Sequence, residues 1–488
     1  MGISFNDIPT AIRVPWAYIE FDASRAVQGS QKKNFTCLVM GQKTASGTAT
    51  ALDIDLISSA DQAGVLYGTG SQLHNMFQAW KANNNFSTVY GMCLSDNGAG
   101  VAAAGSYAFT GTASESGTYN AMIAGRRIQV GITSGDNATT VGDALVAAIA
   151  LDSSLPITAI NTTGTVAITA KNKGLEGNNI DLTENYYEDE ATPAGITVVI
   201  TQMSAGATNP DITTAIAAIP EQQYDIVVIP WTDAANLALI EAELALRWGP
   251  LTQIDSQCFT AADDTVANLG TLGNSRNSPH VTIIEAYKSP SQPCEYAAEA
   301  GATAAFYGSI DPARPYQTLE FKFVKAPKLA NRMLMSERNT LLYDGIATTV
   351  VNASGNVAVE RLITTYKKNA AGADDTAYLD VNTKMTLSYL RWSLRNTLLR
   401  KFPRHKLAND GTRFSQGQAI VTPKVIRAEI IALFDSWEFD GLVEGIDQFK
   451  TDLLVERNTS DPTRLDISMS PDLVNQMRIF GAKIGFLL

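Results

Sequence analysis

The pattern of apolar and polar positions along the first hundred residues predicts a strand, then a helix, then a second strand. Residues 35–41 (FTCLVMG) form a short apolar run of the kind that makes a buried strand, and residues 87–94 repeat that pattern. Between them Ser71, a residue type that caps helices, precedes apolar residues at helical spacing: Leu73, Met76, Phe77 and Trp80. This order predicts a parallel sheet.

The alternation of predicted strands and helices stops at about residue 98 and resumes at about residue 210. A buried strand at 225–231 precedes a helix at 234–248, and further elements follow at 263–272 (helix), 280–286 (strand) and 294–306 (helix). The intervening residues are rich in Gly, Ala, Ser and Thr, with many short strand patterns and one helix pattern at 141–151. We therefore predict one α/β domain made of residues 31–97 and 210–310, interrupted by a β-rich α+β insert at 98–209 that projects outward.

The pattern of predicted elements changes again at about residue 311, where the regular order of strands and helices ends. Residues 361–369 have a strand pattern, 383–400 carry apolar residues at helical spacing, and Thr422 with Pro423 marks another helix start. A hairpin pattern follows at about 449–470. We predict a C-terminal α+β domain at 311–473.

Both ends of the chain are predicted to be arms that stand apart from these domains. Residues 13–22 alternate and are aromatic, with Pro15 favouring an edge strand, and residues 474–488 have one more strand pattern. We assign an N-terminal arm to residues 1–30 and a C-terminal arm strand to 474–488. The fold class is therefore multidomain α/β and α+β.

Composition fits a globular protein with a large core: 45% of the residues are apolar and 18% are charged. No apolar run reaches the ~20 residues of a membrane span, and we expect neither a secretory signal nor direct membrane insertion. The four cysteines are far apart in the sequence, and we predict that they are buried thiols. The net charge of −12 is uneven, because residues 311–488 hold 24 Lys+Arg against 20 Asp+Glu and the acidic excess lies before them. An oriented assembly explains this asymmetry, and so does chance combined with solubility.

Candidate chemistry is sparse. Gly68 and Gly70 precede a helix, but Leu73 occupies the place of the third glycine of a dinucleotide-binding turn and no Walker lysine follows. A tight turn is the better interpretation. The three histidines are isolated from each other and from the cysteines. We predict no catalytic residue, no cofactor and no metal site.

One basic cluster stands out near the centre of the C-terminal domain. Between residues 384 and 413 only Asp410 is acidic, whereas eight residues are basic: Lys384, Arg391, Arg395, Arg400, Lys401, Arg404, Lys406 and Arg413. An acidic protein surface, a solvated helix face and nucleic acid are three possible explanations. We favour the acidic protein partner, because aromatic residues for base stacking are scarce and the whole chain is acidic.

Seven long motifs in the C-terminal half and the N-terminal ~40 residues resemble one known family. They are ISFNDIPTAIRVPWAYIEFD, DPARPYQTL, ERNTLLYDGIATTVV, VERLITTY, AYLDVNTKMTLSYLR, KFPRHKLANDGTR and TDLLVERNTSDPTRLD. In this order they resemble the tail sheath proteins of Mu-like contractile phages. The resemblance covers most of residues 311–470 and does not extend to the insert at 98–209.

The resemblance implies a structural role. It implies hexameric rings stacked around an inner tail tube, an extended state that contracts irreversibly, and partners in baseplate and tail terminator proteins but not in nucleic acid. The C-terminal domain is expected near the tube, where the basic residues from Lys384 to Lys406 are candidate tube contacts. The arms are expected to pair with neighbouring subunits through strand exchange, with these candidate residues: Val14, Trp16, Tyr18, Ile479, Phe480, Ile484 and Phe486.

The expected location is the virion tail, assembled in the host cytoplasm. Two alternatives stay open at this point. In the first, the chain is the sheath of an R-type bacteriocin or of a secretion-type injection machine, whose sheaths are related to those of the phages. A nucleotide-binding α/β enzyme is the alternative from a different class, and it predicts thermal stabilisation by its ligand.

Overall fold

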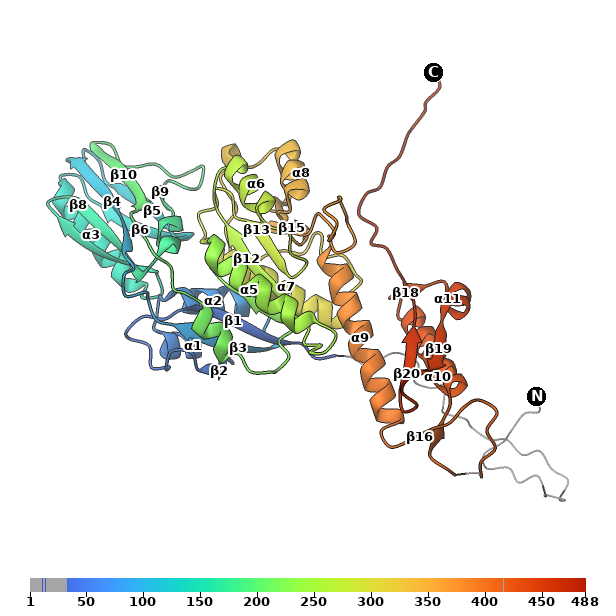
Figure 1. Ribbon diagram of the computed structural model, residues 1–488. Helices are drawn as coiled ribbons and strands as arrows, with labels where there is room; N and C mark the ends of the chain where they lie inside the picture. The colour runs from blue at the N-terminus through green and yellow to red at the C-terminus, as the bar shows by residue number, and fades with distance from the viewer. Residues whose placement is uncertain (1–10, 12–13, 15–32, 416) are drawn as a thin grey trace. The chain divides into compact units, whose positions relative to one another are not determined.

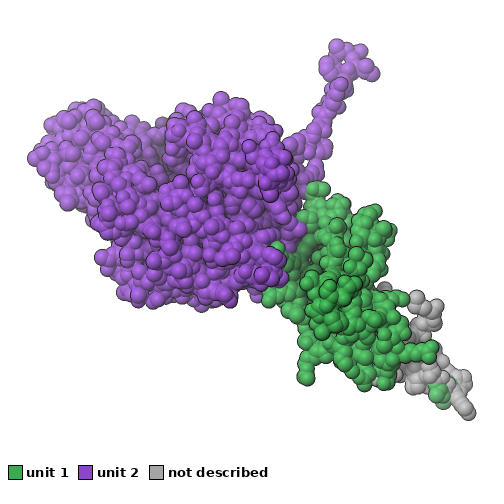
Figure 2. Space-filling view, viewed as in Figure 1, with its two compact units in different colours: residues 1–32, 389–475 green, residues 33–388, 476–488 purple. Residues whose placement is uncertain are grey.

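The structure is a computed structural model that describes residues 11, 14, 33–415 and 417–488. The described chain forms two compact units, which Figure 2 colours separately. The larger unit holds residues 33–388 and 476–488, and the smaller holds residues 389–475.

A six-stranded sheet forms the centre of the larger unit, in the order β13-β12-β11-β1-β3-β2 (Figure 1). Its strands are β1 (Thr36–Gln42), β2 (Ile54–Leu56), β3 (Thr88–Leu94), β11 (Ile226–Val228), β12 (Gln257–Ala262) and β13 (Val281–Glu285). All neighbours pair in parallel except β2 with β3. In the central pairing Cys37 lies opposite Ile226, so strands from before and after the insert share one sheet.

Helices cover both faces of this sheet, which explains the continuous apolar runs of its strands. They are α1 (Ala60–Tyr67), α2 (Gln72–Asn83), α4 (Thr213–Ala218), α5 (Ala234–Trp248), α6 (Val266–Asn274) and α7 (Pro293–Ile310). One buried cluster lies against α2 and α7 and the other against α5 and α6. Ser71 caps α2 as predicted, since its hydroxyl accepts the amide of His74 at 3.1 Å.

Residues from about 101 to 207 form two further sheets. The four-stranded sheet has the order β10-β4-β8-β7 and the three-stranded sheet the order β6-β5-β9. The elements are β4 (Ala102–Gly111), β5 (Gly117–Ile123), β6 (Arg126–Ile132), α3 (Ala138–Leu151), β7 (Ile157–Thr162), β8 (Thr165–Lys173), η2 (Leu175–Asn179), β9 (Leu182–Glu184) and β10 (Ile196–Ser204). Their buried side chains make a hydrophobic cluster that contains no residue of the six-stranded sheet.

The insert contacts the core of its unit through polar groups. Arg126 donates to Gln78 Oε1 at 2.6 Å, and Asn172 donates to the carbonyl of Lys43 at 2.9 Å. The Asn97 side-chain amide donates to the carbonyl of Asn209 at 3.1 Å, which brings the two ends of the insert together. Hydrogen bonds therefore hold the insert in place.

The predicted domain start at residue 311 differs from the division in the structure, because residues 311–388 pack with the larger unit. The elements here are η3 (Leu329–Asn331), α8 (Met335–Asp344), β14 (Thr348–Val351) and β15 (Val357–Arg361). Tyr316 and Phe321 are buried in the same cluster as α7. The change in sequence style at 311 marks the end of the βα alternation and not the edge of a core.

Helix α9 (Val381–Lys401) passes from the larger unit into the smaller one. The other elements of the smaller unit are β16 (Lys406–Leu407), β17 (Ile420–Val421), α10 (Pro423–Phe439), β18 (Val443–Glu444), α11 (Ile446–Asp452), β19 (Leu454–Arg457), β20 (Leu465–Ser468) and β21 (Asp472–Leu473). The indole of Trp437 donates to Ser393 Oγ at 3.0 Å and links α10 to α9. Strands β19 and β20 form the predicted hairpin.

Two predicted strands are not found as such in the described chain, and a third cannot be compared. The pattern at 361–369 gives a strand only up to Arg361, where β15 ends. Residues 474–488 contain no strand, since β21 stops at Leu473, and the large apolar residues from Ile479 onward are exposed. The arm at 13–22 lies outside the described residues except for Val14, which is exposed.

Candidate assembly surfaces

Most residues of the basic cluster are exposed or half-buried, whereas Lys384 is buried. Arg395, Arg400, Arg404 and Lys406 are exposed, and Arg391 is half-buried. Lys406 Nζ donates to Gln418 Oε1 at 3.0 Å. Lys401 forms an ion pair with Glu429 of α10. The smaller unit therefore presents basic side chains to solvent along the last turns of α9 and the loop after it.

Lys384 has to be removed from this set. Its side chain is 2% exposed, and its ammonium group donates to the carbonyl of Ser256 at 2.6 Å and to Gln257 Oε1 at 3.1 Å. The ammonium also lies 5.3 Å from the centre of the Trp248 ring, at cation–π distance. The first turn of α9 is packed inside the larger unit, so Lys384 has an internal structural role.

The last ten residues form an exposed apolar segment. Ile479, Phe480, Ile484 and Phe486 are each at least 80% exposed. No helix or strand includes residues 474–488. Apolar side chains of this size cost free energy when they face water. Of the candidate arm residues, Trp16 and Tyr18 lie outside the described residues.

The sequence analysis missed the residue that holds this segment to its unit. Arg478 of the arm forms an ion pair with Asp380, the residue before α9. Both side chains are mostly buried, at 13% and 15% exposed. A lone arginine in an apolar terminal run was the available signal.

The turn before α2 is filled by the protein's own groups. Gly68 and Gly70 have φ values of +88° and +78°, which are left-handed conformations that favour glycine. The amide of Gly70 already donates to His74 Nδ1 at 3.0 Å. Burial, together with the positive charges of Arg126 and Lys171, lowers the pKa of His74 to about 4. This is the tight turn that the sequence predicts.

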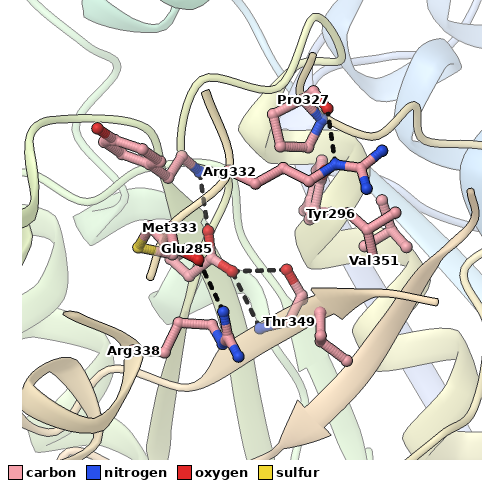
Figure 3. Close-up of a pocket in the computed structure, with 11 residues that line it drawn as sticks. Glu285, Tyr296, Pro327, Arg332, Met333, Arg338, Thr349 and Val351 are labelled. Carbon is pink, nitrogen blue, oxygen red and sulfur yellow. Dashed lines mark hydrogen bonds between the residues drawn. The ribbon is translucent and has the colours of Figure 1, made fainter. Parts of the chain in front are cut away.

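A pocket of about 150 Å³ lies beside β13, β14 and the segment after α7 (Figure 3). Glu285 is its buried carboxylate, and burial raises the pKa of this group to about 7. Its oxygens accept the amide of Thr349 and the amide of Tyr287, each at 2.9 Å. These bonds fix β14 and the turn at Tyr287, so the carboxylate stabilises the local fold.

The described part of the chain lacks a metal-ligand cluster. No group of three or more His, Cys, Asp and Glu side chains there is arranged to hold a metal ion. Of the helices that the structure describes, none is long and apolar enough to cross a membrane.

Comparison with known proteins gives consistent matches along the chain. Residues 205–365 match the family model for the phage tail sheath protein central domain, and residues 373–486 match that for the phage tail sheath C-terminal domain. The chain is 44% identical over 488 residues, all of both chains, to the Mu-like prophage FluMu tail sheath protein of Haemophilus influenzae.

Two solved structures are similar to the chain at much lower sequence identity. The sheath tail protein of Listeria innocua matches with a TM-score of 0.50 at 11% identity, over 93% of this chain and 94% of that one. The sheath tail protein of Desulfitobacterium hafniense has a TM-score of 0.49 at 12% identity, over 95% and 97%.

Proposed function

The chain belongs to the phage tail sheath protein family, and from this we propose that it polymerises as stacked hexameric rings around an inner tail tube and contracts to drive that tube through the target cell envelope. It is a structural component of a phage tail. The proposed contraction is irreversible.

One observation carries the proposal: the exposed apolar segment after Arg478. A segment whose large apolar side chains are left exposed by the described part of its own chain is suited to bind another copy. Alternation puts Phe480, Ile484 and Phe486 on one face of an extended strand. Strand addition to a neighbour supplies main-chain hydrogen bonds that persist while subunits move as rigid bodies.

The inner tube is the second proposed partner. The exposed basic residues on the last turns of α9 suit an acidic tube surface, with Arg395, Arg400 and Arg404 as the contacts and Lys401 shared with Glu429. Each exposed pair contributes only about 0–1 kcal/mol, but every subunit repeats it. The sum of these weak contacts over all subunits holds the extended sheath on the tube. The contacts can separate during contraction because no apolar interface has to be opened.

Baseplate and tail terminator proteins complete the proposed partners, with assembly in the host cytoplasm. The same surfaces would serve a bacteriocin sheath or a secretion-type injection machine, and the arm does not distinguish them.

Electron microscopy of the purified full chain tests the proposal. We expect long hollow tubes with six-fold symmetry. A chain that stays monomeric at all concentrations, with or without a tube protein, would refute the proposed polymerisation. A small-molecule enzyme instead predicts a raised melting temperature on addition of a nucleotide, which we do not expect.

A further inference from the structure

An open pocket of about 480 Å³ lies in the larger unit, beside the ends of α6 and α8. Leu342, Tyr343, Tyr366 and Leu379 contribute its apolar lining. Tyr343 is 78% exposed, so its ring lies open to solvent at the rim of the pocket. Volumes of about 300–1,000 Å³ are typical of pockets that bury drug-sized groups, so this pocket can hold more than one large side chain.

Positive charge is held in place at this pocket. Lys367 Nζ donates to the backbone carbonyls of Gly273 at 2.7 Å and Asp344 at 2.8 Å. These acceptors fix the ammonium group without neutralising it, because a carbonyl oxygen carries no net charge. Lys368, which also lines the pocket, is exposed. An apolar pocket with a fixed cation suits an apolar segment that ends in a carboxylate.

Two carboxylates also line the pocket, and both come from the loop that follows Lys368. Asp375 accepts the hydroxyl of Tyr366 at 2.5 Å and the amide of Ala377 at 2.9 Å, whereas Asp374 is exposed. A segment that carries one cation before its terminal carboxylate therefore complements both signs of charge at the pocket.

The C-terminal arm of the same chain is such a segment, and it is tethered beside the pocket. Leu379 lines the pocket, and the next residue, Asp380, forms the ion pair with Arg478. Residues 479–488 follow the tether and can span up to about 33 Å. They include Lys483, and the last three residues are apolar and each at least 80% exposed. The arm can therefore reach the pocket with matching chemistry.

We propose that, before assembly, the apolar end of the arm folds back into the pocket of its own chain. The last three residues then lie against Leu342 and Tyr343, with the terminal carboxylate directed toward Lys367. The tether at Arg478 keeps the local concentration of the segment high, so weak contacts are sufficient. The cost of ordering flexible residues opposes closure, so the closed form opens readily.

The closed arm acts as a latch on polymerisation. A segment that lies in its own pocket is not available for strand addition to a neighbour, so the two states exclude each other. This step rests on the proposed function, in which the arm joins subunits. The latch also covers large apolar side chains that free subunits would otherwise present to one another. A subunit therefore stays monomeric until a growing sheath offers its arm a better site.

A disulfide between the arm and the pocket rim tests the latch in the full chain. Gly485→Cys keeps the last three residues, and among the described residues no atom lies within 4 Å of a Cβ at that position. Its partner is Tyr343→Cys. The four native cysteines are buried, so oxidised glutathione acts on the introduced pair. We expect a disulfide within one chain, whose yield does not depend on protein concentration.

Met335→Cys replaces Tyr343→Cys in the matched control. Met335 is 79% exposed and lies on the same helix, eight residues or about 12 Å from Tyr343. A disulfide requires Cα atoms within about 7 Å, so an arm in the pocket cannot reach both positions at once. We expect at least a tenfold lower yield for the control pair. Circular dichroism checks that each variant is folded.

Tube formation separates the latch from the proposed function. The oxidised Gly485→Cys and Tyr343→Cys chain should form no tubes, and reduction should restore them. Equal yields for the two pairs, disulfides only between chains, or tubes from the oxidised chain would overturn this inference and leave the proposed function intact. A selective disulfide in a chain that forms no tubes even when reduced would support the folded-back arm and overturn the proposed polymerisation.

Discussion

Arg478 and Asp380 join the C-terminal arm to the start of α9 through an ion pair of 3.0 Å. Asp380 also accepts two hydrogen bonds from Arg361 at 3.0 Å, so one carboxylate holds two guanidinium groups. The chain is thus anchored at residue 478, and the apolar segment begins immediately afterwards.

Truncation after Arg478 should leave a folded monomer that forms no tubes. The anchor stays intact in this variant, whereas removal of all residues from 474 onward also removes the ion pair. Circular dichroism and electron microscopy measure the two effects. As a control, Asp380→Asn should lower the melting temperature and still allow tubes, because the apolar segment remains. Normal tubes from the truncated chain would exclude strand exchange by this arm.

Charge reversal at Arg400 and Arg404 should release the tube early. Both side chains are exposed, and reversal there breaks no ion pair that the structure records, unlike reversal at Lys401. Raising salt should promote premature contraction of wild-type tails, because the screening length falls from about 8 Å at 0.15 M to about 3 Å at 1 M. The contracted fraction is counted in electron micrographs.

The matched control for that experiment reverses Lys322 and Lys325, two exposed lysines of the larger unit. It should behave as wild type at every salt concentration. Equal stability of the Arg400 and Arg404 variant would show that the basic residues form a solvated face.

Deletion of residues 98–209 should preserve a soluble core. The insert has its own hydrophobic cluster, and the hydrogen bond between Asn97 and Asn209 shows that a short linker can close the gap. Polar groups that the deletion exposes, such as Gln78, can be hydrated. Solubility and melting temperature are the readouts, with Arg126→Ala as a milder variant. Insoluble protein would mean that the insert shares the main core.

Glu295 should make stability fall as pH rises. This fully buried carboxyl has one oxygen without a partner among the described residues, and burial raises its pKa from 4.5 to about 7, although Arg126 lowers it. The protonated form is favoured in the folded state, so the stabilisation is fully present below pH 4.5 and is lost as pH rises through about 7.

Glu295→Gln should therefore stabilise the protein at pH 8 by about 1–3 kcal/mol and reduce the slope of melting temperature between pH 5 and pH 8. The exposed Glu188→Gln serves as the control. Glu285 and Glu299 leave a residual slope, since burial raises the pKa of each as well. An unchanged slope in Glu295→Gln would contradict the assignment.

Local signals in the sequence predicted those elements whose pattern is set by nearest neighbours. The cap at Ser71, the helix at 234–248 and the hairpin of β19 and β20 all follow from spacing alone. Tertiary packing decided the rest. Lys384 shares a helix face with Arg391 and Arg395 by periodicity, yet the first turn of α9 is packed against Ser256 and Trp248. No helical pattern shows where a helix enters a core.

The pairing of Cys37 with Ile226 has a consequence for synthesis of the chain on the ribosome. Strand β1 ends at Gln42, and its partner β11 begins at Ile226, so β1 waits for 184 residues to be made. At roughly 5–20 residues per second that delay is about 10–40 s. The insert, with a core of its own, can finish folding in this interval. The apolar edge of β1 is meanwhile open to wrong partners, and the nascent chain is most vulnerable to aggregation until β11 emerges.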